Sequence, residues 1–118
     1  MTFAEFLAWQ WGDYPAKHRS RLNLAIHIVA VPLFMLGCVA VAIGILRLAP
    51  LRIVSGLVAM VVAVGLEGIG HRFEPERPAP FAGFGDFAKR FFFEQWVTFP
   101  RFVLSGRYFQ NLAGPGRS

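Results

Sequence analysis

The sequence is poor in the residues that keep most small proteins soluble. Only 16% of its 118 residues are charged, and it contains one cysteine, Cys38, and three histidines. A single cysteine excludes an internal disulfide. A small domain has a large surface for its volume, and so few charges cannot cover that surface in water. The scarcity of charge therefore indicates that lipid covers part of the molecule.

Hydrophobic residues make up 55% of the chain and are concentrated in two runs. The run from Leu24 to Leu46 is long enough, as a helix, to cross a hydrocarbon core of about 30 Å. The run from Ile53 to Leu66 reaches that length only if its helix continues to Gly70. The segment from Arg47 to Arg52 is expected to form a compact turn between them. The predicted fold class is all-α, an integral membrane helical hairpin of two spans with flanking amphipathic interfacial helices.

The residues before the hairpin predict a short amphipathic helix. Residues 2–11 carry a rough apolar stripe with two tryptophans, which suits a membrane interface. The segment from Gly12 to Pro15 is expected to break this helix.

The residues after the hairpin predict further interfacial helices. A loop rich in proline and glycine covers residues 74–85, and Asp86 is expected to cap a helix that Pro100 interrupts. A short helix is expected over residues 101–112. Residues 1–113 are expected to form a single domain, followed by a disordered tail at 114–118.

The net charge of +5 could suggest a nucleic-acid partner. The basic residues flank the apolar runs, however, and the sequence contains no nucleic-acid motif, so anionic lipid headgroups explain them better. Most lysines and arginines lie outside the turn of the hairpin. This bias predicts that both termini lie in the cytoplasm.

The three histidines sit where a hairpin would bring distant parts of the chain together. His27 lies near the start of the first run and His71 closes the second, so the hairpin places them at one level. His18 joins them if the first long helix begins near Ser20 and the preceding segment folds back. Three neutral imidazoles near a carboxylate suit iron, zinc or another first-row metal.

Several ligand sets and roles remain open at this stage. Two imidazoles with Glu67 or Glu74 would form the facial triad of non-haem iron oxygenases. His27 and His71 could instead be axial ligands of a haem. A non-catalytic membrane module that binds lipid or a partner protein would use the histidines only for hydrogen bonds. No serine or cysteine nucleophile accompanies a histidine, which argues against triad hydrolases.

Two segments carry a resemblance to a known family. Tyr14-x3-His18-x4-Asn23-x3-His27 and Gly70-His71-x2-Glu74-x3-Pro78-Ala79 resemble the two signatures of the Mpo1-like family, also called the DUF962 domain. The resemblance extends from about Tyr14 through Tyr108.

The resemblance implies a function and a set of site residues. The characterised fungal member is an Fe(II)-dependent dioxygenase of the endoplasmic reticulum membrane, which shortens a 2-hydroxy fatty acid by one carbon in α-oxidation. The resemblance implies that His18, His27 and His71 hold iron. Asn23 and Glu74 match the other polar signature positions, and such residues can orient the ligands, as we also expect of Tyr14.

Departures from the family pattern qualify the resemblance, among them Pro75, which follows Glu74 where a basic residue is common. Glu67 stands where the family often has glutamine, which adds a possible anionic ligand. The stretch from Glu94 to Arg101 is similar to a bacterial branch, so we expect a bacterial inner membrane location.

The expected function is therefore that of an Fe(II)-dependent dioxygenase acting with O2 on a lipid-derived 2-hydroxy acid. Glu67, Glu74 and Arg72 are the candidate catalytic residues. Arg72 or Arg19 would pair with the substrate carboxylate, because the guanidinium fork binds carboxylates at two points.

Overall fold

The computed structural model describes residues 1–114, and this part of the chain contains helices and no strand, which confirms the all-α prediction. The predicted tail at 114–118 lies, apart from Gly114, outside the described residues. The elements in chain order are α1 (Phe3–Lys17), α2 (Arg21–Leu46), α3 (Pro50–His71), α4 (Phe84–Phe93), the π-helical turn η1 (Glu94–Thr98), α5 (Phe99–Leu104) and α6 (Arg107–Leu112).

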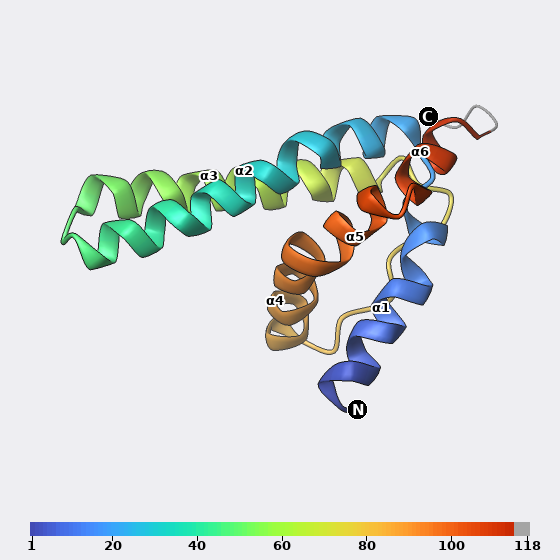
Figure 1. The fold of residues 1–118 in the computed structure, drawn as a ribbon, viewed down its shortest axis with the longest axis horizontal. Coiled ribbons are helices and arrows are strands. Elements are labelled where there is room, and N and C mark those ends of the chain that lie inside the picture. The colour runs from blue at the N-terminus through green and yellow to red at the C-terminus, as the bar shows by residue number, and fades with distance from the viewer. Residues whose placement is uncertain (115–118) are drawn as a thin grey trace.

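Helices α2 and α3 form the predicted antiparallel hairpin, which projects from the rest of the molecule (Figure 1). Both are long and apolar enough to cross a membrane. α3 continues past Leu66 to His71, and its 22 residues correspond to about 33 Å at 1.5 Å per residue. The Ser20 side chain caps α2 by accepting a hydrogen bond from the Asn23 amide, so the helix begins where the fold-back of His18 requires.

Two glycines let the hairpin helices pack closely. A β-carbon added at Gly37 would lie 2.7 Å from the carbonyl oxygen of Gly56, and one added at Gly56 would lie 2.6 Å from that of Gly37. No larger side chain fits at either position without displacing the backbone. Small residues at such crossings are typical of helices that associate in lipid.

The predicted break of the first helix at Gly12–Pro15 is wrong, because α1 continues to Lys17. Thr2 and Glu5 form a capping box that fixes its start. Pro15 stands in the last turn, where its missing amide removes only one hydrogen bond and little helix follows. α1 therefore ends just before His18.

The predictions for Asp86 and Pro100 are also wrong. α4 begins at Phe84, so Asp86 lies inside its first turn rather than at the cap position. The Asp86 carboxylate accepts a hydrogen bond from the Ala82 amide, which precedes the helix. The helical path then runs through Pro100, because the wider turn η1 precedes it and the Phe99 amide donates to the Glu94 carbonyl, five residues back. A π-helical turn of this kind is often found at functional sites.

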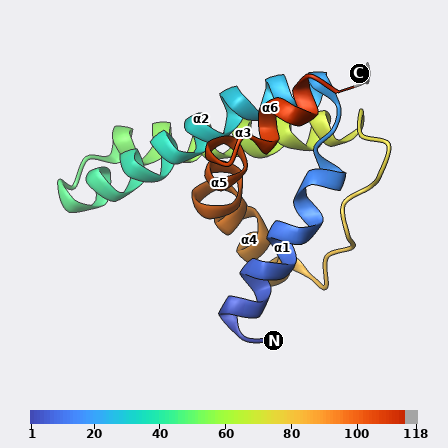
Figure 2. The ribbon, with the colours of Figure 1, turned by 45° about the vertical axis from the view of Figure 1, so that its right-hand side comes forward.

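The remaining helices lie beside the end of the hairpin where α2 begins and α3 ends, with α1, α4 and α5 on one side of it (Figures 1 and 2). The buried cluster there includes Tyr14, Leu24, Phe102 and Tyr108. The Tyr108 hydroxyl donates to the Leu24 carbonyl at 2.9 Å, which ties α6 to α2. This packing brings α1, α2, α3 and η1 to one point.

Candidate metal centre

The three histidines meet at this end of the hairpin. His18 follows α1, His27 lies in the second turn of α2, and His71 is the last residue of α3. Their ring centroids are 4.8–5.2 Å apart, and each pair of rings is nearly perpendicular. The predicted convergence of all three rings is therefore present in the fold, including His18.

Two of the rings are oriented by backbone carbonyls. Nδ1 of His18 lies 2.9 Å from the Tyr14 carbonyl oxygen, and Nδ1 of His27 lies 3.0 Å from that of Asn23. A carbonyl oxygen can only accept, so Nδ1 carries the proton and a neutral ring keeps its lone pair on Nε2. Metal-binding histidines are commonly fixed in this way. Tyr14 and Asn23 thus hold the rings in place through their backbones.

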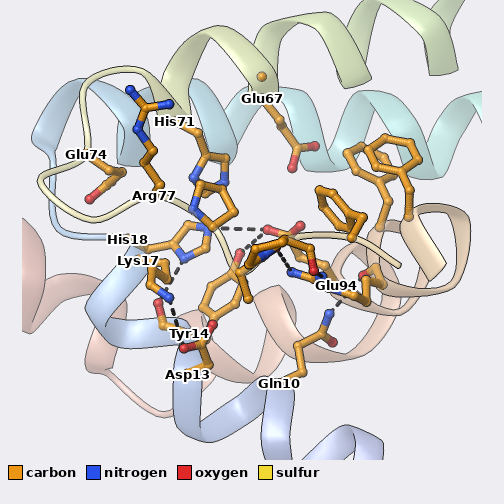
Figure 3. A pocket seen from close by; sticks show the side chains of 18 of the residues that line it. Gln10, Asp13, Tyr14, Lys17, His18, Glu67, His71, Glu74, Arg77 and Glu94 are labelled. Carbon is orange, nitrogen blue, oxygen red and sulfur yellow. Dashed lines mark hydrogen bonds and ion pairs between the residues drawn. The ribbon is translucent and has the colours of Figure 1, made fainter. Parts of the chain in front are cut away.

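Sequence reasoning missed a fourth member of the cluster, Glu94. The ligand atoms of His18, His27, His71 and Glu94 lie within 4.8 Å of one another. The Oε2 atom of Glu94 is 3.3 Å from Nε2 of His18 and accepts the Tyr14 hydroxyl at 2.6 Å (Figure 3). The available signal was an acidic residue directly after three consecutive phenylalanines.

The cluster contains acceptors that face one another. Nε2 of His18, Nε2 of His27 and Nδ1 of His71 are buried, and none has a hydrogen-bond partner among the described residues. Buried polar atoms are nearly always partnered. Bare imidazole nitrogens beside a carboxylate oxygen repel each other unless a cation or a proton lies between them. Three imidazoles and one carboxylate therefore fit a first-row metal such as Fe(II) or Zn(II).

The protonation states outside the hairpin agree with this. Burial lowers the pKa of His18, which favours the neutral ring that metal binding requires. Burial raises the pKa of Glu94, but protons on the facing nitrogens of His18 and His27, whose place a bound cation would take, outweigh burial and hold that pKa well below its usual range. Burial and the Glu94 charge raise the pKa of Tyr14, which stays a neutral donor.

A protein-family comparison supplies the context for this cluster. The family model described as "Mpo1-like: 2-hydroxy-palmitic acid dioxygenase Mpo1-like" matches residues 2–100. The chain belongs to the Mpo1-like family. The matched range contains all three histidines and Glu94. Comparisons with curated proteins and with solved structures found no match.

In this Mpo1-like protein Glu67 lies beside the cluster. Its carboxylate is buried, with Oε1 3.1 Å from Nε2 of His27. The same oxygen accepts a hydrogen bond from the Gln95 side chain at 2.9 Å. Gln95 and Glu94 both belong to η1. The π-helical turn therefore supplies both the carboxylate that faces His18 and the amide that binds the Glu67 carboxylate.

Glu74, the other candidate carboxylate, lies outside the cluster. It accepts hydrogen bonds from the backbone amides of Arg19 at 2.8 Å and Ser20 at 3.0 Å, and from the Asn23 side chain at 2.7 Å. A carboxylate at a helix N-terminus satisfies free amides and interacts favourably with the helix dipole. Glu74 therefore anchors the start of α2 and the segment that carries His18.

A cavity of about 850 Å³ adjoins the cluster in this Mpo1-like protein. This volume is within the range of small-molecule sites. His18, Glu67, His71 and Glu94 line it, so the candidate metal centre is directly accessible from the cavity. The exposed Arg72 side chain, a sequence candidate for binding a carboxylate, also lines it. Further basic lining residues are Lys17, Arg77 and Arg90.

Proposed function

We propose that this Mpo1-like protein is a membrane-embedded Fe(II)-dependent dioxygenase that converts a 2-hydroxy fatty acid into the acid one carbon shorter. The observation that carries the proposal is the group of His18, His27, His71 and Glu94, whose ligand atoms lie within 4.8 Å of one another. The printed description of the family, which names a 2-hydroxy-palmitic acid dioxygenase, supports the reaction class. The two long apolar helices support a membrane location, for which we propose cytoplasmic termini in a bacterial inner membrane.

The proposed reaction balances without an added reductant. A 2-hydroxy acid and O2 yield the shortened acid, carbon dioxide and water, with the C1–C2 bond broken and O2 fully reduced. Bound iron, held by the three histidines and Glu94, would supply the activation of O2.

The chain's own residues would position the substrate. Arg72 lines the cavity next to His71 in sequence, and its guanidinium suits a carboxylate. Glu67 faces the same cavity and can accept a hydrogen bond from the 2-hydroxyl group. Arg72 would thus fix the substrate carboxylate and Glu67 its 2-hydroxyl group beside the cluster, while the apolar lining excludes water.

The ring geometry favours this proposal over the alternatives. The His27 and His71 ring centroids are 5.2 Å apart, and His18 and Glu94 lie beside them, which leaves no room for a haem macrocycle between the two rings. A non-catalytic module would not require His18 to join the cluster, yet its ring lies 4.9 Å from that of His27.

The test is the metal content of protein purified anaerobically in detergent, with wild type beside His71→Ala. We expect near-stoichiometric iron in the wild type and its loss in the variant, followed by oxygen uptake by the wild type with 2-hydroxy fatty acids. The exposed Glu76→Gln variant is the control and should retain iron. Zinc in place of iron would redirect the search to Lewis-acid chemistry. Protein that remains metal-free after addition of Fe(II) would contradict the proposal and favour the non-catalytic module.

A further inference from the structure

The cavity has a polar end and an apolar end. Three helical segments line the cavity. Each carries an apolar lining residue at one end and a residue of the metal cluster at the other. The segments run from Trp9 on α1 to His18 just after it, from Val64 to His71 on α3, and from Phe87 on α4 to Glu94 at the start of η1. Because a helix rises 1.5 Å per residue, these stretches span about 10–13 Å. Their cluster members lie together, so their apolar members mark the opposite part of the cavity.

Aromatic rings form the apolar end. We call Trp9, Phe81, Phe87 and Phe91 the aromatic wall, since all four line the cavity. The Phe81 and Phe87 ring centroids are 5.1 Å apart, and those of Phe87 and Phe91 are 5.7 Å apart. Phe91 packs edge-on against Phe34 of α2 at 5.0 Å, which fixes the wall to the hairpin. Packed aromatic rings of this kind make a firm apolar surface.

Arg90 holds the wall together and is not free to bind a ligand. Its guanidinium donates to the carbonyl oxygens of Ala79 at 2.9 Å and Pro80 at 3.0 Å. The same group lies 4.0 Å from the Phe81 ring centroid and 5.0 Å from that of Trp9. Cation–π contacts and hydrogen bonds thus attach the loop before α4 to α1 and α4. Arg90 is a positioning residue.

We propose that the aromatic wall is the subsite for the acyl chain and limits the length of the chain that the cavity accepts. This inference rests on the proposed function, because a carboxylate placed at the metal cluster directs the alkyl tail along the cavity toward the wall. An alkyl tail has no polar group that needs a hydrogen-bond partner. The wall presents apolar rings to it, and the Arg90 guanidinium beside the wall is already bound to carbonyl oxygens. Removing a ring from the wall should therefore admit longer chains.

The test is a binding series with Trp9 as the reporter. Trp11→Phe and Trp96→Phe leave Trp9 as the only tryptophan. Loading the protein with Zn(II), which has no redox chemistry, lets 2-hydroxy acids bind without being consumed. Each added methylene should tighten binding about four-fold until the tail reaches the wall, after which the gain should stop.

The decisive comparison is Phe87→Ala against Phe84→Ala. Phe84 is on the same helix, but it is 73% exposed and does not line the cavity. We expect Phe87→Ala to move the limit to longer chains and Phe84→Ala to leave it unchanged. Should Phe87→Ala fail to fold, as judged by helix content and melting, Phe87→Leu should show a smaller shift in the same direction.

The outcomes separate this inference from the proposed function. Equal length limits in the Phe87 and Phe84 variants would overturn the subsite, even if the iron-loaded protein consumes oxygen. A shifted limit in protein that consumes no oxygen would support the subsite and contradict the dioxygenase. A variant that keeps only Trp96, which does not line the cavity, reports general effects of the acids on the detergent and should give a flat signal.

Discussion

The Oε2 atom of Glu94 lies 3.4 Å from Nε2 of His27, although the two residues come from opposite parts of the chain. Glu94 directly follows α4, with its amide still donating to the Arg90 carbonyl, and it is the first residue of the π-helical turn η1. The same turn places Gln95 against Glu67 at 2.9 Å. The junction of α4 and η1 therefore supplies both the carboxylate that joins the three imidazoles and the amide that contacts Glu67.

Glu94→Gln should weaken metal binding. The change keeps the shape of the side chain but removes the negative charge that faces Nε2 of His18 and His27. Loss of a group that only orients a ligand costs roughly 10- to 100-fold in affinity, and loss of a ligand should cost at least as much. Titration of metal-free protein with Fe(II) measures the change. The exposed Glu76→Gln is the matched control, and equal affinities for the two variants would remove Glu94 from the metal site.

Tyr14→Phe should weaken metal binding with little change in packing. It removes the hydroxyl that donates to Glu94 at 2.6 Å, while the phenyl ring can still stack on His18, where the ring centroids are 3.6 Å apart. We expect an affinity loss of roughly 10- to 100-fold, as for other groups that orient a ligand.

Tyr108→Phe is the matched control for Tyr14→Phe. Its hydroxyl donates to the Leu24 carbonyl, away from the cluster, so its loss should lower the free energy of unfolding by about 1 kcal/mol and leave metal affinity unchanged. A pair of variants with the same metal affinity would show that the Tyr14 hydroxyl does not support the site.

Glu74→Ala should lower both stability and metal affinity. The carboxylate accepts hydrogen bonds from Arg19, Ser20 and Asn23, and their donors lose a charged partner in the variant. Hydrogen bonds to charged groups contribute about 1.5–3 kcal/mol each, so we expect a fall of at least 2 kcal/mol in the free energy of unfolding. Thermal melting with and without metal measures it. Glu76→Ala is the control, and a Glu74 variant that melts with it would refute the anchoring role.

Much of the site could be predicted because simple rules place it. The hairpin follows from two apolar runs and a short turn, and it fixes the level of His27 and His71. The position of His18 required only that α2 begin near Ser20, which the cap confirms.

The missed features depend on irregular backbone. The sequence predicts helix breaks at Pro15 and Pro100. Pro15, however, lies in the last turn of α1, where a proline is tolerated, and a π-helical turn precedes Pro100. The inward position of Glu94 depends on the packing of η1 against α1 and α2, which are distant in sequence. A periodic pattern does not show such tertiary packing, and beyond the wide turn it also fails, because that turn changes which face every later residue occupies.

Gly56→Ala should destabilise the hairpin more than Gly65→Ala. A β-carbon at Gly56 would lie 2.6 Å from the Gly37 carbonyl oxygen, whereas one at Gly65 meets no atom within 4 Å. Overpacking costs about 1–3 kcal/mol, while replacing an unconstrained helical glycine by alanine gains up to about 1 kcal/mol. Thermal unfolding in detergent should therefore shift in opposite directions for the two variants. Because His27 and His71 lie at the end of the same hairpin, Gly56→Ala should also weaken metal binding, and a variant that melts like Gly65→Ala would show that the close crossing contributes nothing to either property.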